Sequence, residues 1–333
     1  MKRIPVGWRL FGGAVLLFGA GIIGGVFITG MRAPVVVTAV RNPHTGFSLI
    51  DPTLYTESPE ALSYPKYAPV KNAFTARIAA AEKTGKVTDV SVYFRDLNSG
   101  EWVGINHTDQ FDPASLLKVI TLMALLRRSE ETPSILSSNI NVPASVVIPT
   151  GTQDYFPPLN PVQSGNSYTV PVLATKLITQ SDNGANALLI QFLGDSALAT
   201  VFETLNVPVP GATTGVTAQQ YSHLFRVLYN ASYLSPADSE KALELLTQTT
   251  FTSGIVAGVP AGTTVAHKFG ESTPALRSTD PSTHELHDCG IVYYPGHPYF
   301  LCVMTRGTDF PALAATIQDL SLSAWQQVSA LKA

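Results

Sequence analysis

Hydrophobic and polar positions divide the chain into three stretches. Residues 10–29 form a run of twenty uncharged, mostly apolar residues. Residues 33–66 carry prolines at 34, 43, 52, 59 and 65 and show no helical period. Twenty helical residues span about 30 Å, the thickness of a bilayer's hydrocarbon core. We therefore predict a cytoplasmic stub and transmembrane anchor over residues 1–32, a linker over 33–66, and a folded domain over 67–333.

Basic residues on either side of the apolar run indicate its orientation. Lys2, Arg3 and Arg9 precede the run, whereas Arg32 and Arg41 follow it. This asymmetry favours a cytoplasmic N-terminus and an exported body. The alternative is a cleaved signal peptide, whose apolar region is normally 7–15 residues long and ends in a small-x-small site. Here the run is longer and the nearest such site lies beyond Arg32, so we predict an uncleaved, single-pass anchor in the cell membrane.

Periodicity in the rest of the chain predicts an α/β fold of the α+β type. Strand patterns fall at residues 89–97, 101–106, 263–269, 290–294 and 299–305. Helical patterns fall at residues 68–83, 115–126, 170–180, 184–193, 197–205, 218–229, 236–247 and 312–331, and residues 132–169 look like a loop excursion. This order suggests an antiparallel five-stranded sheet completed by both ends of the chain. N- and C-terminal helices would flank that sheet, with an all-helical subdomain inserted at about 113–262.

Composition excludes several classes of function. Lys plus Arg is 21 and Asp plus Glu is 24, for a net charge of −3. A chain with this balance lacks the basic surface of a nucleic-acid-binding protein. Its two cysteines, Cys289 and Cys302, cannot form a disulfide framework or a four-thiolate zinc site. Their pairing depends on the register of the last hairpin, and we expect two reduced core cysteines, with a disulfide as the alternative.

A polar run at residues 284–289 contains the spacing His284-x-x-His287. This differs from the His-Glu-x-x-His pattern of zinc peptidases. We predict that the run is a polar loop before a strand, and that the protein uses no metal and no other cofactor.

Ser115 and Lys118 lie three residues apart at the start of a helix that is apolar on nearly every face. At this spacing, both side chains share one helix face. A serine hydroxyl becomes a good nucleophile when a base removes its proton, and a lysine serves as that base when burial or a second cation lowers its pKa. The spacing alone carries little information, because roughly one such pair is expected by chance in a chain of this length.

Two further patterns follow in order, Ser181-Asp182-Asn183 and Lys268-Phe269-Gly270. The set resembles the three signatures of serine β-lactamases and penicillin-binding proteins: Ser-x-x-Lys, Ser-Asp-Asn and Lys-Thr-Gly. Segments 111–119, 177–189, 258–270 and 288–296 look like class A β-lactamase segments, and the resemblance covers roughly residues 71–331.

The resemblance implies a role for each matching residue. Ser115 would be the acylated nucleophile, Lys118 its proton acceptor, and Ser181 the relay of a proton to the leaving nitrogen. Asn183 would hold Lys118 and the substrate's amide, while Lys268 would supply positive potential that lowers the pKa of Lys118.

Other residues of the matching segments are expected to bind or border the substrate. Backbone N–H groups of Ser115 and Glu271 would form the oxyanion hole. Gly270 would border the substrate, and Tyr155 would form an aromatic edge of the pocket. Asp182 is expected to cap the following helix rather than touch substrate.

The chain departs from the family pattern at three places. No Asp or Glu occurs between Glu203 and Asp238, where class A enzymes carry the glutamate that activates the deacylating water. Glu203 is the nearest upstream carboxylate, but its helical pattern predicts a surface residue. Phe269 replaces a hydroxyl residue that binds the substrate carboxylate in the family, and Glu271 adds a negative charge two residues on. We expect both side chains at the substrate if strand alternation turns them toward the site, where they would weaken binding and where Glu271 is a candidate replacement base. The segment after Glu285 also lacks the arginine with which many class A enzymes bind the substrate carboxylate.

Three functions follow from these observations. The first is a membrane-anchored serine hydrolase resembling class A β-lactamases, which opens a β-lactam or related amide and deacylates slowly. The second is a penicillin-binding-type D,D-peptidase that acts on peptidoglycan peptides. The third is a catalytically degenerate binding module of the cell envelope. We expect a small-molecule substrate and a monomer.

Overall fold

The computed structural model describes residues 46–52, 65–148, 153, 155–209, 215–273 and 280–331. The chain divides into two units, Met1–Thr38 and Ala39–Ala333, and all the described residues belong to the second. The predicted anchor over residues 10–29 lies outside them. Within the described residues, no single helix is long and apolar enough to cross a membrane, although the bent pair Asn183–Leu193 and Ser196–Thr204 passes that test jointly.

A five-stranded antiparallel sheet forms the centre of this unit, in the order β2-β1-β7-β6-β5. Its strands are β1 (Val87–Asp96), β2 (Trp102–Ile105), β5 (Val265–Ser272), β6 (His284–Val292) and β7 (Tyr299–Gly307). Since β1 pairs with β7, both ends of the folded region contribute to one sheet. The predicted α+β fold with a five-stranded antiparallel sheet is confirmed, and β5 lies at one edge of the sheet.

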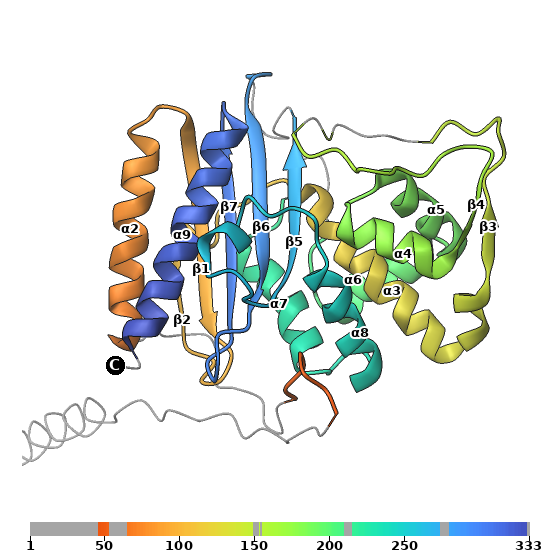
Figure 1. The fold of residues 1–333 in the computed structure, drawn as a ribbon, viewed down its shortest axis with the longest axis horizontal. Helices are drawn as coiled ribbons and strands as arrows, with labels where there is room; N and C mark the ends of the chain where they lie inside the picture. Colours follow the sequence, from red (N-terminus) through yellow and green to blue (C-terminus); the bar gives the residue numbers. More distant parts are fainter. Residues whose placement is uncertain are drawn as a thin grey trace, which may run out of the picture. The chain divides into compact units, whose positions relative to one another are not determined.

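Helices cover both faces of the sheet. Helices α2 (Ala68–Glu82) and α9 (Phe310–Ala330) run side by side over one face (Figure 1), where their apolar residues share a buried cluster with β1, β6 and β7. Helix α7 (Ala218–Tyr229) packs against β7 and β1 through a second cluster. The remaining helices lie beyond the β5 edge in Figure 1: α3 (Lys118–Glu131), α4 (Val170–Thr179), α5 (Asn183–Leu193), α6 (Asp195–Thr204) and α8 (Pro236–Thr247).

Helix α3 runs through the centre of the helical region. Its residues Val119 to Leu126 are all buried. A helix that is apolar on every face is stable only when other elements surround it. Contacts with α4, α5, α6 and α8 surround α3, and its first residue is Lys118.

Two stretches predicted as loops contain ordered structure. Strands β3 (Asn139–Asn141) and β4 (Ser167–Thr169) form a small ribbon inside the excursion at residues 132–169. Residues 46–52, inside the predicted linker, pack against the domain, where the carboxylate of Glu240 accepts the N–H groups of Ser48, Leu49 and Ile50.

Strand β6 begins at His284, six residues before the predicted strand. The polar run at residues 284–289 is therefore part of the sheet, which corrects the loop prediction. Its polar side chains are buried with partners: the carboxylate of Glu285 accepts Arg306 Nε at 2.8 Å, and Asp288 Oδ1 lies 2.8 Å from His267 Nδ1. Polar residues can occupy a central strand when their hydrogen bonds are satisfied.

Cys289 and Cys302 form a disulfide, so the expectation of two reduced cysteines was wrong. Val292 on β6 pairs with Tyr299 on β7, and residues 293–298 connect the two strands. This register places Cys289 directly opposite Cys302 on β6 and β7.

Candidate active site

Ser115 lies on a short 3-10 turn, Ala114–Leu117, which leads directly into α3. Ala114, the residue before it, has a φ of 45°, a region that non-glycine residues seldom occupy. Ser115 is 8% exposed and Lys118 is 3% exposed. Lys118 Nζ lies 2.8 Å from Ser115 Oγ, so the predicted pair is in direct hydrogen-bond contact.

The Ser-Asp-Asn segment surrounds the amine of Lys118 with oxygen atoms. Lys118 Nζ donates to the backbone carbonyl of Ser181, and lies 3.0 Å from Ser181 Oγ and 2.7 Å from Asn183 Oδ1. Ser181 has a φ of 58°, which turns its carbonyl and hydroxyl toward the lysine. Asp182 accepts the N–H groups of Ala185 and Val162, so it caps α5 as predicted.

Burial lowers the pKa of Lys118 to about 7, against the opposing effect of the carboxylates of Asp182 and Glu271. The pKa of Lys268 also lies well below its usual value, first because of burial and then because of the positive charge of Lys118. The sequence predicted that the second lysine would lower the pKa of the first. In the structure, burial is the main cause, and the repulsion between the two ammonium groups acts on Lys268.

Edge strand β5 brings the third motif beside the nucleophile. Lys268 is fully buried; its Nζ donates to Phe269 O at 2.8 Å and lies 4.2 Å from the centroid of the Phe269 ring. A Cβ at Gly270 would lie 3.0 Å from Pro113 O and 3.2 Å from Ser115 N. These distances are shorter than most Cβ contacts, so a glycine at this position favours the close approach of the strand to the backbone of the nucleophile.

The cavity beside Ser115 has a volume of about 870 Å³. One of its walls is apolar and amide side chains form much of the rest. Its lining includes Ser115, Lys118, Asn183, Gln153, Asn186, Gln191, Asp112, Glu271, Leu117, Ile120, Ile190, Leu198 and Phe202. A cavity of this size and mixed character is typical of a small-molecule site.

Phe269 turns away from this cavity and stacks on Phe251, at a centroid distance of 4.6 Å. Glu271 lines the cavity, and its carboxylate accepts the backbone N–H of Phe156 at 3.2 and 3.3 Å. Tyr155 stacks on Phe310, at a centroid distance of 5.0 Å, and is not among the described residues that line the cavity. The structure therefore corrects the expected substrate contacts of Phe269 and Tyr155, because, of these three side chains, the described lining includes only Glu271.

The loop before Ser115 is held by side chains of the sheet. Asp112 N donates to Glu285 Oε2 at 3.0 Å, and Asp112 O lies 2.8 Å from His287 Nε2. Arg306 lies 4.8 Å from the centroid of the Phe111 ring and pairs with Glu285. Although burial raises the pKa of Glu285, His287 and Arg306 hold it below its usual value. The polar run at residues 284–289, which we predicted to be a loop, thus holds the segment that precedes the nucleophile.

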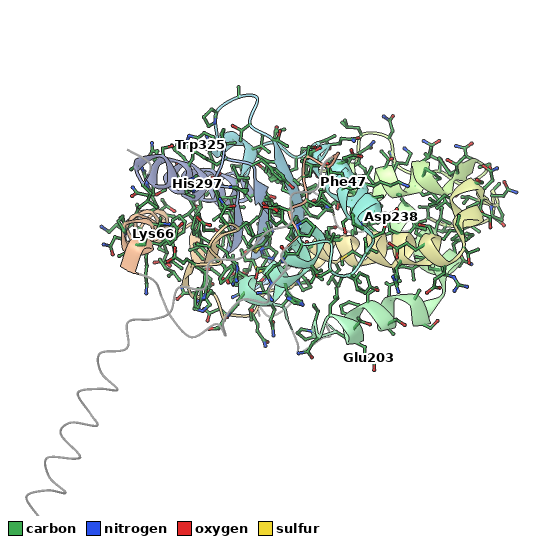
Figure 2. All side chains as sticks on the ribbon, turned by 90° about the horizontal axis from the view of Figure 1, so that it is seen from below. Phe47, Lys66, Glu203, Asp238, His297 and Trp325 are labelled. Carbon is green, nitrogen blue, oxygen red and sulfur yellow. A yellow bond between two sulfur atoms is a disulfide. The ribbon has the colours of Figure 1, made fainter. Side chains whose placement is uncertain are left out.

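Carboxylates that could activate a deacylating water are few. Glu203 is exposed on α6, and Figure 2 shows it at the outer edge of the molecule. The segment expected to carry the deacylating glutamate is short, and its end is joined to the nucleophile's loop by a bridge between Val216 and Phe111. Asp112 and Glu271 are the acidic residues among the described lining.

No group of three or more His, Cys, Asp or Glu side chains in the described ranges is arranged to hold a metal ion. Several lining residues were not predicted from the sequence, among them Gln153, Asn186 and Gln191. Gln153 belongs to no motif and comes from the excursion at residues 132–169.

The sequence model of the Beta-lactamase enzyme family matches residues 71–328. The chain belongs to this family. A β-lactamase from Streptomyces fradiae is 26% identical over 240 residues, which cover 67% of this chain and 74% of the relative. The carbapenem-hydrolyzing β-lactamase KPC from Klebsiella oxytoca is 25% identical over 238 residues, 66% of this chain and 76% of that protein. The protein is thus a serine β-lactamase-like hydrolase.

Solved structures show the same fold. The structure of PBP-A superposes with a TM-score of 0.63 at 22% identity, covering 78% of this chain and 96% of that chain. A β-lactamase from Sphaerobacter thermophilus superposes with a TM-score of 0.64 at 22% identity, covering 78% of this chain and 97% of its own.

Proposed function

We propose that this β-lactamase-like protein opens β-lactams, or related amides, by forming an acyl-enzyme on Ser115. The observation that carries the proposal is the contact of 2.8 Å between Lys118 Nζ and Ser115 Oγ. With a pKa of about 7, a large share of Lys118 is neutral at physiological pH. A neutral amine at hydrogen-bond distance can remove the hydroxyl proton as Ser115 attacks the carbonyl carbon.

The remaining groups have roles that fit this step. Ser181 Oγ, 3.0 Å from Lys118 Nζ, relays the proton to the leaving nitrogen. The close approach of Gly270 to Ser115 N supports an oxyanion hole formed by the N–H groups of Ser115 and Glu271. Such donors stabilise the developing negative charge by about 3 kcal/mol each. Lys268 is a second buried amine, and its pKa is lowered first by burial and then by the positive charge of Lys118.

We propose that deacylation is slow. The sequence holds no Asp or Glu between Glu203 and Asp238, and Glu203 is exposed. Acylation by a β-lactam is supported by the relatives, which include β-lactamases and, among structural neighbours, a variant of PBP-A described as an acyl-enzyme complex with penicillin G. The expected product with penicillin is a long-lived adduct.

Labelling with a fluorescent penicillin tests the proposal. The wild-type protein should carry one covalent label on Ser115, located by peptide mass spectrometry. The variants Ser115→Ala and Lys118→Met should lose labelling, whereas Ser134→Ala, at an exposed serine, should retain it. Labelling that survives in S115A would overturn the assignment. Nitrocefin hydrolysis then measures turnover, and a rate limited by release of the adduct is expected.

A D,D-peptidase is the second candidate, because transfer of the acyl group to an amine needs no deacylating glutamate. The short segment after Glu203 favours it. Release of D-alanine from a peptide ending in D-Ala-D-Ala, blocked by penicillin, would support this function over β-lactam turnover.

A degenerate binding module is a weaker candidate. Phe269, one of the two residues that suggested it, packs against Phe251 and leaves the cavity open. Absence of both labelling and peptidase activity would favour it.

We also propose that residues 10–29 anchor a monomeric protein in the cell membrane, with its catalytic domain on the extracytoplasmic side. The uncharged run and its basic flanks support this proposal. Membrane fractions should retain the full chain after a carbonate wash, and added protease should digest the domain in intact cells after the outer envelope is opened. A chain lacking residues 1–32 should appear in the soluble fraction. Light scattering of the detergent-solubilised full chain should give the mass of one chain.

A further inference from the structure

Gln153 lines the cavity beside Ser115, although no sequence motif includes it. Its side chain is only 9% exposed, and Asn183 Nδ2 donates to its Oε1 at 3.1 Å. Its other polar atom, Nε2, is buried and has no hydrogen-bond partner within the described part of the chain. A buried donor without a partner is unfavourable, so an acceptor that binds there regains the lost hydrogen bond.

The orientation of this amide follows from its neighbours. In its protonated form, Lys118 Nζ has only donors, so the atom of Asn183 that lies 2.7 Å away is then the acceptor, Oδ1. Asn183 then presents Nδ2 toward Gln153, and the Gln153 atom that receives it must be the oxygen. Nε2 is left as the remaining polar atom of the amide. The direction of hydrogen bonding is therefore fixed from Lys118 outward to Gln153.

We propose that Gln153 Nε2 donates a hydrogen bond to a carbonyl oxygen of the substrate outside the bond being cleaved. This assignment rests on the proposed function and moves the contact with the substrate's side-chain amide from Asn183 to Gln153. Two carboxylate residues of the lining, Asp112 and Glu271, disfavour an anionic acceptor. The preferred substrate class is an amide or β-lactam that carries a second, neutral carbonyl group.

A matched pair of ligands separates this contact from the rest of the site. Benzylpenicillin has a side-chain amide carbonyl, and its analogue with that C=O reduced to CH₂ has none. In the wild-type protein, the labelling rate constant of Ser115 should be higher for benzylpenicillin. The ratio of the two rate constants should fall about tenfold in Gln153→Met, since loss of one buried hydrogen bond of about 1.4 kcal/mol changes a rate tenfold.

Two further variants sharpen the test. Gln153→Glu keeps the acceptor for Asn183 but replaces the donor by a carboxylate oxygen, so the ratio should fall further than in Q153M. Gln163→Met is the matched control, because Gln163 is an exposed glutamine of the same excursion. An unchanged ratio in both Gln153 variants would show that the residue has only a structural role, and would overturn the inference.

Binding without chemistry distinguishes this inference from the proposed function. In the Ser115→Ala background, calorimetry should show tighter binding of benzylpenicillin than of its reduced analogue, and Q153M should remove most of the difference. If the wild type fails to label but this difference is present, the acyl-enzyme proposal fails and the role of Gln153 stands. If the wild type labels but S115A binds both ligands equally, or neither, the role of Gln153 is refuted.

Discussion

Replacing Glu271 by glutamine tests how the site controls the charge of Lys118. The negative charge of Glu271 favours the protonated lysine and therefore raises its pKa, in opposition to burial. Glutamine keeps an oxygen that can accept the N–H of Phe156, so the variant removes the charge and preserves the contact. The midpoint of the pH profile for Ser115 acylation should therefore move down from about 7.

The size of the effect follows from the neutral fraction of the amine. If the pKa falls by about one unit, the neutral fraction at pH 6 rises from roughly one-tenth to one-half, a gain of about fivefold. At pH 9, both proteins hold a mostly neutral lysine, so their rates should differ little for this reason.

Stopped-flow labelling of Ser115 between pH 5 and 10 measures this profile directly. Glu203→Gln is the matched control, since Glu203 is exposed on α6 and its charge should leave the midpoint unchanged. A wild-type midpoint near 10, the value of an ordinary lysine, would refute the argument that burial prepares the base. A midpoint that rises in E271Q would refute the sign assigned to Glu271.

Three other changes follow from the contacts around the nucleophile. Gly270→Ala places a Cβ against the backbone of the nucleophile's turn, so acylation should slow more than tenfold, as measured by penicillin labelling. Replacing both Cys289 and Cys302 by alanine should lower the free energy of unfolding by about 3 kcal/mol, the loop-entropy value for their separation of 13 residues. Urea titration measures this loss, and reduction of the wild-type disulfide should reproduce the loss. Glu285→Gln removes the buried negative charge that pairs with Arg306, and should cost about 3 kcal/mol in the same titration, with slower labelling. Unchanged stability would contradict the role of this pair.

The fold followed from periodicity because most elements have one apolar face. Four of the five strands, the buried helix after Ser115 and the final helix lie close to the predicted ranges, and β6 begins six residues early. Residues 284–289 could not be predicted as strand, because their polar side chains find partners only in the folded chain: Glu285 with Arg306, and Asp288 with His267. The same reason hid the disulfide, which depends on a register set by long-range pairing.

The sequence likewise predicted only part of the candidate site. The spacing of Ser115 and Lys118 within one helical turn was enough to predict their contact. The direction of Phe269 was not, since it depends on the aromatic residues that pack against β5. Gln153 had no sequence signal, because it belongs to the long excursion and its hydrogen bond with Asn183 joins residues thirty positions apart.

Four oxygen atoms around Lys118 Nζ have a consequence for the speed of proton transfer. They come from Ser115, Ser181 and Asn183 and stand in place of a hydration shell. A neutral amine has two hydrogens and one lone pair, and an ammonium has three hydrogens. The same shell can satisfy both forms, so Lys118 can take up and release a proton while every heavy atom around it stays where it is. Little reorganisation energy is then added to the barrier of each transfer.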